Sequence, residues 1–222
     1  PKKMAPAKAY APELVDLKIT DRCNCGCEYC YQESSPDGKH ADKIALVRVI
    51  GALAVNKVFE VAIGGGDPTL HPYFHELLEK CAKNGVTPNF STRDHEWLDN
   101  PVNRDVFQKC GGAIAISAGD PFTVRRVGAQ KLLYRLDRGR AAIHYVMGTR
   151  SLSTLEDMLR ACHEVHLPIV LLGYKKIGTK AAKFAASWGM NKIDGWEDIL
   201  IKLREEGKCP RVSVDTALLE AQ

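Results

Sequence analysis

Apolar residues along this chain follow two alternating spacings, one typical of buried strands and the other of amphipathic helices. Between the strand-like runs, apolar residues recur at helical spacing, as in Phe74, Leu77, Leu78 and Cys81. Strands separated by helices predict a parallel sheet with right-handed crossovers. The predicted strands span 14–20, 58–63, 87–91, 113–117, 141–146 and 168–172, with a short seventh run at 212–214.

The number of these units predicts an α/β fold of the partial-barrel kind. A complete eightfold barrel takes about 250 residues, whereas this chain of 222 residues has six firm strand-helix units. We therefore expect an open (β/α)6 TIM-like barrel with parallel strands. Residues 1–12 read as a flexible arm and 13–175 as the barrel core. Residues 176–222 read as a C-terminal extension that completes or caps the barrel and either ends a short protein or is truncated.

Two helix ends have local sequence signals. Gly85 follows an apolar helical pattern and is placed to terminate that helix, because glycine readily adopts the left-handed conformation. Ser153 and Glu156 have the spacing of a capping box, which predicts a helix start at Ser153.

Four cysteines within eight residues, Cys23, Cys25, Cys27 and Cys30, form the densest group of metal-binding side chains. Thiolates favour zinc, copper(I) and iron–sulfur clusters. A structural zinc site usually combines two cysteine pairs across a longer spacer, and no second pair follows here. Ferredoxin clusters take four cysteines, so the triplet Cys23, Cys27 and Cys30 would leave one iron open. Cys25 is expected to be a spectator, and the role of Cys209 is open.

Two motifs resemble those of the radical S-adenosylmethionine (SAM) enzymes. The run from Ile19 to Cys30, with Tyr29 before the last cysteine, resembles their cluster loop. Residues 64–72, Gly-Gly-Gly-Asp-Pro-Thr-Leu-His-Pro, resemble their glycine-glycine-glutamate-proline motif. The resemblance also implies a six-unit partial barrel. Asp67 stands where the family usually has glutamate, which puts a direct carboxylate contact with the SAM amine in question.

The resemblance implies that Cys23, Cys27 and Cys30 hold a 4Fe-4S cluster whose fourth iron binds SAM. Reductive cleavage of SAM would then form methionine and a 5′-deoxyadenosyl radical that abstracts a hydrogen atom from a substrate. Such an enzyme is oxygen-sensitive and needs an electron donor such as flavodoxin or ferredoxin. The protein itself positions the cofactors and excludes competing reactions.

Further SAM contacts are expected at the ends of the strands, although ordinary strand-end packing explains each single residue equally well. The loop over 173–194 is a candidate substrate contact or lid, with surface decoration as the alternative. The predicted cofactor-binding residues are Tyr29, Gly64, Gly65, Gly66, Asp67, Ser91, Thr92, Ser117, His144, Tyr174 and Lys175.

Composition gives only coarse information about binding partners, localisation and substrate class. The net charge of +4 fits a solvated basic face better than a nucleic-acid surface. No apolar run is long enough to span a membrane and no signal peptide is evident, so we expect a cytoplasmic protein. The open side of a partial barrel favours a peptide or protein substrate over a small metabolite. Two alternatives remain, a non-catalytic zinc-binding module and an enzyme that activates a glycyl-radical protein.

Overall fold

The computed structural model describes residues 10–130, 140–188 and 193–219, which contain a single seven-stranded sheet. Its strands pair in chain order and every pair is parallel, while no pairing among the described residues joins β1 to β7. The chain thus forms the predicted partial TIM-like α/β barrel. The strands are β1 (Leu14–Thr20), β2 (Glu60–Gly65), β3 (Thr87–Thr92), β4 (Ile114–Ser117), β5 (Ala141–Val146), β6 (Ile169–Leu172) and β7 (Val212–Val214).

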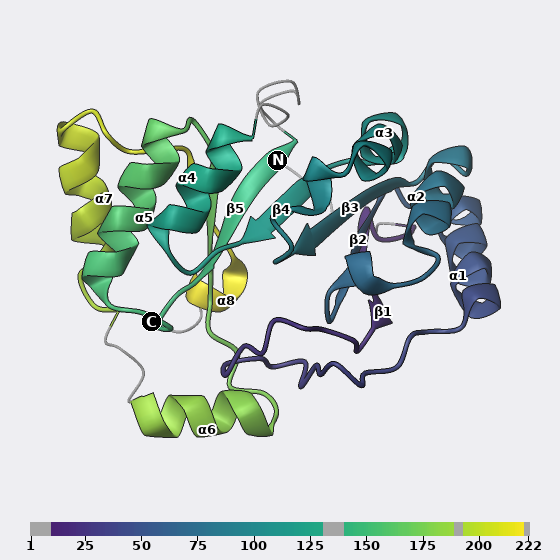
Figure 1. Cartoon of the computed structure of the whole chain (residues 1–222), viewed down its shortest axis with the longest axis horizontal. Coiled ribbons are helices and arrows are strands. Elements are labelled where there is room, and N and C mark those ends of the chain that lie inside the picture. The colour runs from purple at the N-terminus through teal and green to yellow at the C-terminus, as the bar shows by residue number, and fades with distance from the viewer. Residues whose placement is uncertain (1–9, 131–139, 189–192, 220–222) are drawn as a thin grey trace, which may run out of the picture.

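Seven of the eight described α-helices fall into two outer groups and one separate element, and the short α8 lies against β6. Figure 1 shows α1 to α3 beside one end of the sheet and α4, α5 and α7 beside the other, whereas α6 lies apart, beside the long loop after β1. The helix that follows β6 is therefore not the one that covers the outer face there; α7 does so. The helices are α1 (Lys43–Val55), α2 (Phe74–Lys83), α3 (Pro101–Cys110), α4 (Pro121–Ala129), α5 (Leu152–Glu164), α6 (Thr179–Trp188), α7 (Trp196–Glu205) and α8 (Thr216–Leu219), with 3-10 turns η1 (Pro68–Leu70) and η2 (Trp97–Asp99).

Most of the predicted strand limits agree with the structure, and the largest difference is at β2. Val58 was expected to begin this strand, but its N–H donates to the carbonyl of Leu53 at 3.0 Å and closes the end of α1. The strand begins at Glu60 and continues through Gly65, so the first two glycines of the motif belong to the strand itself. The division into arm, core and extension stays a prediction, and residues 1–9 of the expected arm lie outside the described part.

The capping box at Ser153 and Glu156 is wrong, whereas the position of Gly85 is confirmed. Helix α5 is capped by Ser151, whose hydroxyl accepts from the N–H of Thr154 at 3.3 Å, and Ser153 lies inside the helix. The carboxylate of Glu156 instead forms ion pairs with Arg160 and Lys202, which compete with the hydrogen bond that a capping box would require. Gly85 follows the end of α2 with a φ of +73°, a conformation in which glycine carries little strain.

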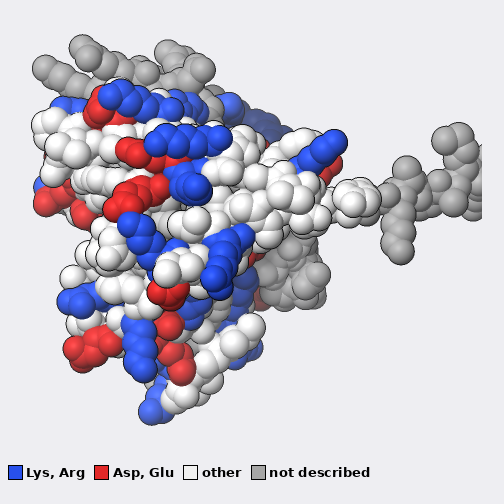
Figure 2. Space-filling view, turned by 90° about the vertical axis from the view of Figure 1, so that its right-hand side faces the viewer, with Lys and Arg blue, Asp and Glu red and all other residues white. Residues whose placement is uncertain are grey.

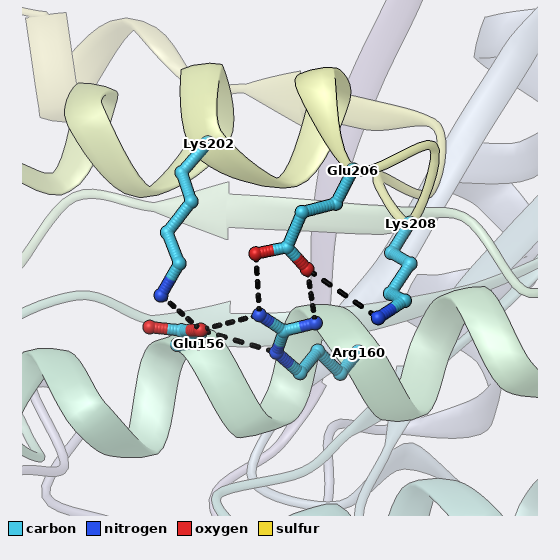
Figure 3. A network of polar contacts seen from close by, with 5 residues as sticks. All are labelled: Glu156, Arg160, Lys202, Glu206 and Lys208. Atoms are coloured by element: carbon cyan, nitrogen blue, oxygen red, sulfur yellow. Dashed lines mark hydrogen bonds and ion pairs between the residues drawn. The ribbon is translucent and has the colours of Figure 1, made fainter.

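An ion-pair network joins α5 to α7 (Figure 3). Glu156 accepts from Arg160 of its own helix and from Lys202 of α7, at 2.7 and 2.9 Å. Arg160 also pairs with Glu206 at 2.8 Å, and Lys208 lies 3.5 Å from Glu206. Single exposed ion pairs contribute little to stability, but shared partners reduce the cost of ordering each side chain. The network orients α7 on the outer layer.

An aromatic cluster fixes the end of β3 against the helices. The ring of Phe90 meets those of Phe74, Trp97 and Phe107 edge to face, with centroids 5.0, 5.3 and 5.7 Å apart. All four side chains are buried in the core, and removing one such ring typically costs about 3–5 kcal/mol. The residues that follow Phe90 at the end of the strand therefore project from a well-packed support.

The surface seen over α1 and α2 carries both signs of charge. Figure 2 shows basic and acidic side chains interspersed on this face, without a large area of one sign. In the described ranges, no helix has the length and apolar character that crossing a membrane requires.

Candidate active site

The cysteine loop leaves β1 at the carboxyl end of the strand and returns to the same place. The N–H of Asp21 donates to the carbonyl of Lys39 at 2.8 Å, and that of Ala41 donates to the carbonyl of Ile19 at 2.9 Å. The buried hydroxyl of Thr20 accepts from the N–H of Arg22 and contacts Nδ1 of His40, both at 2.9 Å. The loop is thus closed at its base, at the end of the barrel where parallel α/β folds place their chemistry.

The four cysteines of this loop differ in exposure. Cys23, Cys27 and Cys30 are half-buried, whereas Cys25 is exposed, and all four are free thiols. The side chain of Cys25 hydrogen-bonds to Cys23, which lowers the pKa of Cys23 to about 6 and raises the pKa of Cys25. Exposure therefore distinguishes the predicted ligand triplet from Cys25, although Cys25 contacts Cys23 of the triplet.

The donor set suits an iron–sulfur cluster better than a single zinc ion. Among the described residues, no three Cys, His, Asp or Glu side chains converge on one metal position. A closed zinc site would need its thiolates at about 2.3 Å from one ion. An iron–sulfur cube accepts cysteines on different iron atoms, so its ligands need not converge. Three half-buried thiols on one short loop fit that requirement.

The glycine turn, residues 64–67, packs against the base of the cysteine loop, residues 21–42. The N–H of Gly66 donates to the carbonyl of Thr20 at 2.7 Å, and a Cβ on Gly66 would lie 2.2 Å from the carbonyl oxygen of Arg22. Gly65 has a φ of +122°, and a Cβ there would lie 2.2 Å from the Thr20 carbonyl oxygen. Close backbone approach therefore explains both glycines.

Close backbone approach does not explain the glycine at position 64. A Cβ at this position would meet no atom of the chain within 4 Å. Gly64 alternates along β2 with Ile63, whose side chain is buried in the core, so it belongs to the opposite strand face. Of the three glycines, this one leaves space that the chain itself does not fill.

Asp67 ties the glycine turn to the end of β3. Its carboxylate is buried, 3% exposed, and accepts from the hydroxyl and N–H of Thr69 at 2.7 and 3.2 Å. It also accepts from the Thr92 hydroxyl at 2.8 Å and from the N–H of Arg93 at 3.2 Å. These bonds occupy the carboxylate and the Thr92 hydroxyl with partners in the chain. A direct cofactor contact by either side chain stays a prediction.

Three other predicted residues come together on adjacent strands. The hydroxyl of Ser91 on β3 lies 3.3 Å from Nδ1 of His144 on β5. Ser117 of β4, between these strands, pairs in register with His144. The predicted polar group at the strand ends is therefore a spatial cluster, and burial lowers the pKa of His144 to about 4.

Helix α6 packs on the cysteine loop. The N–H of Thr179 donates to the carboxylate of Glu33, and Nζ of Lys180 donates to the carbonyl of Ser34 at 2.9 Å. Phe184 of α6 meets Tyr29 edge to face at 5.7 Å and stacks on Tyr174 at 6.0 Å. The loop suspected at 173–194 thus contains a helix that brings Tyr29 and Tyr174 into one aromatic cluster; residues 189–192 lie outside the described part.

Lys175, which follows Tyr174, is exposed. Lys175 extends over the ring of Tyr31 at 5.0 Å from its centroid, which is a favourable cation–π distance. Its predicted role toward a cofactor stays a prediction.

Comparison with known proteins agrees with this arrangement. A sequence model of the radical SAM superfamily matches residues 17–99, which include the cysteine loop, the glycine turn and β3. Residues 17–99 therefore match the radical SAM superfamily. The predicted cofactors, a 4Fe-4S cluster and SAM, are those of this superfamily.

Two curated proteins and one solved structure are similar to this chain. It is 24% identical to a "Probable GTP 3′,8-cyclase" of Sulfolobus acidocaldarius over 95% of this chain and 73% of that protein. It is 34% identical to the PqqA peptide cyclase of Methylorubrum populi, over 37% of this chain and 22% of that protein. SuiB of Streptococcus suis bound to its precursor peptide SuiA has the same fold, with a TM-score of 0.69 at 13% identity.

The similar proteins are mostly longer than this chain. The SuiB match covers 96% of this chain but 52% of SuiB. A second SuiB structure, bound to SAM, matches with a TM-score of 0.68.

Arg93 is the residue of this candidate site that sequence reasoning missed. It directly follows Thr92, and its Nη1 lies 2.8 Å from Sγ of Cys27 and 3.4 Å from the hydroxyl of Tyr29. Burial opposes the charge of its guanidinium, but Tyr29 and Cys27 outweigh this effect and raise the pKa of Arg93. A basic residue directly after the Ser-Thr strand end was the available signal.

The neutral state of His144 predicts a pH-dependent stability. Burial lowers its pKa from 6.5 to about 4, so the unfolded chain binds a proton that the folded chain does not. Stability contributed by this group is complete above pH 6.5 and is lost as the pH falls towards 4. Urea unfolding should show that His144→Gln loses less stability than wild type between about pH 7.5 and pH 4.5, by about 2–3 kcal/mol. Equal losses in both proteins would contradict a neutral His144.

Proposed function

We propose that this radical SAM enzyme uses Cys23, Cys27 and Cys30 to hold the 4Fe-4S cluster and acts on a peptide or protein. Held there, the cluster and SAM would supply one-electron reductive cleavage of SAM and, through it, abstraction of a hydrogen atom from the substrate. The residues of this chain bind the cofactors, orient them and limit access of water and oxygen.

One observation supports this assignment above the others. Three half-buried free thiols lie at the carboxyl end of β1, and the exposed Cys25 is distinct from them. Next to them, Gly65 and Gly66 admit the backbone of the cysteine loop, and Gly64 leaves open space. The site therefore combines a three-thiol donor set with a glycine turn whose first residue faces space that the chain does not fill.

The other polar groups suit different parts of SAM. Ser91, Ser117 and the neutral His144 offer hydroxyls and an imidazole at adjacent strand ends, and such groups can bind ribose hydroxyls or a carboxylate. Tyr29 and Tyr174, with Phe184, offer aromatic surface for the adenine base. Asp67 and Thr92 act as positioning residues, because they connect the glycine turn to β3.

A peptide substrate is supported by the names of several relatives. PqqA peptide cyclase matches part of the chain, and the SuiB structure with the same fold holds a precursor peptide. One relative that matches over 95% of this chain is named a probable GTP 3′,8-cyclase, so a nucleotide is the second candidate substrate. The electron donor, flavodoxin or ferredoxin, also belongs to this proposal. Activation of a glycyl-radical protein has no support from these relatives.

The test of the proposal is anaerobic reconstitution of the full chain with iron and sulfide. We expect a brown protein with about four irons per chain, which forms 5′-deoxyadenosine from SAM after reduction with dithionite. Omission of the reductant or exposure to air should prevent the reaction. A colourless protein that retains about one zinc and forms no 5′-deoxyadenosine would contradict the proposal and support the zinc-binding module.

The substrate class requires a second measurement. Deuterated peptides and deuterated GTP can be supplied separately, and the deuterium content of the 5′-deoxyadenosine measured by mass spectrometry. Transfer from peptide supports the proposed class, whereas transfer from GTP alone would replace it with the nucleotide.

A further inference from the structure

The main chain of Arg93 is held by hydrogen bonds, and its side chain extends towards the cysteine loop. Its N–H donates to the carboxylate of Asp67 at 3.2 Å, and the next residue, Asp94, donates its N–H to the Thr92 hydroxyl at 2.9 Å. The aromatic packing of Phe90 supports the strand that precedes these residues. The position from which the Arg93 side chain extends is therefore well determined.

The guanidinium group makes an unusual set of contacts. Its Nη1 lies 2.8 Å from Sγ of Cys27 and 3.4 Å from the hydroxyl of Tyr29. The structure shows no carboxylate within ion-pair distance of it among the described residues. A half-buried cation is costly unless a negative group compensates it. The Cys27 sulfur becomes such a group when it is deprotonated and binds iron.

A cation at this sulfur favours one oxidation state of the cluster over the other. When the cluster accepts one electron from a chemical reductant, it gains one negative charge. Hydrogen bonds to the ligand sulfurs and nearby net charge are among the main determinants of iron–sulfur potentials. A charge-assisted N–H···S bond stabilises the reduced, more negative state more strongly than the oxidised state.

We propose that Arg93 hydrogen-bonds to the Cys27 sulfur of the assembled cluster and thereby raises the reduction potential of that cluster. The proposal rests on the proposed function, because it requires Cys27 to be a ligand. Arg93 acts through the cluster, whose reduction potential it adjusts, and is therefore a positioning residue. Without it, reduction of the cluster would require a stronger reductant.

The experiment compares the midpoint potentials of anaerobically reconstituted full chains by redox titration followed with electron paramagnetic resonance. Arg93→Met removes the charge and the donors but keeps much of the side-chain length, and should lower the potential. Arg93→Lys keeps the charge and should restore the potential towards that of wild type. Arg48→Met is the matched control, because Arg48 is an exposed residue of α1, and its potential should equal that of wild type.

The outcomes separate this proposal from the proposed function. Equal potentials in cluster-containing wild type and Arg93→Met would overturn the role of Arg93 alone. An equal fall in Arg48→Met would also overturn it, because general charge would then explain the effect. If Arg93→Met assembles no cluster, Arg93→Gln takes its place, because it stays polar but loses the charge of the hydrogen bond to Cys27; a lowered potential supports the proposal and an unchanged one overturns it. Wild-type protein that binds no cluster would overturn both proposals.

Discussion

Cys27→Ser is expected to abolish cluster assembly and all cleavage of SAM. A serine hydroxyl is a hard, weak donor for iron compared with a thiolate. The triplet has no spare member, because the proposal leaves the fourth iron for SAM. Iron and sulfide analysis after anaerobic reconstitution should show the content falling from about four irons per chain to background, with no detectable 5′-deoxyadenosine. Cys23→Ser and Cys30→Ser should behave in the same way.

Cys25→Ser is the matched control for this prediction. Cys25 lies on the same loop, but it is exposed while the triplet is half-buried. The variant should retain the iron content and SAM cleavage of wild type. Loss of iron in Cys25→Ser, together with retention in Cys27→Ser, would show that the ligand set is assigned incorrectly.

Gly66→Ala is expected to give the second large effect, on folding of the cysteine loop. The added Cβ would lie 2.2 Å from the carbonyl oxygen of Arg22 and 2.7 Å from its carbonyl carbon. Both are backbone atoms, so the turn and the loop must separate, which weakens the hydrogen bond from Gly66 to Thr20. We expect a loss of about 1–3 kcal/mol in the free energy of unfolding, measured by urea titration of cluster-free protein, and a lower iron content after reconstitution.

Gly64→Ala provides the comparison within the same motif. A Cβ at Gly64 meets nothing within 4 Å, so the free energy of unfolding should stay within about 0.5 kcal/mol of wild type. If a ligand occupies the open space, the same variant should weaken SAM binding to the reconstituted enzyme, as measured by equilibrium dialysis. Equal destabilisation by the two substitutions would contradict the distinction between a packing glycine and a ligand-facing glycine.

The sequence by itself predicted the succession of the strands and marked the cysteine loop as the candidate cluster site. Strand limits such as Leu14–Thr20 and Ala141–Val146 agreed with the structure because local apolar runs bounded by polar residues specify buried strands. The cysteine triplet could be recognised because its spacing is a local property. The capping box failed because Ser151 and Ser153 are both suitable caps locally; in the structure Ser151 caps α5, and the Glu156 carboxylate pairs with Arg160 and with Lys202 of α7.

Only the tertiary structure decided how residues from distant segments share the work of the site. The three glycines are identical in sequence, yet the carbonyls of Thr20 and Arg22 give Gly65 and Gly66 a packing reason that Gly64 lacks. Arg93 lies 66 residues from Cys27 along the chain and 2.8 Å from its sulfur in space. Helix α6 likewise reaches the cysteine loop through Lys180 and Ser34, 146 residues apart. Such contacts depend on the path of the parallel strands, which brings their carboxyl ends to one edge, and no local pattern encodes which side chains meet there.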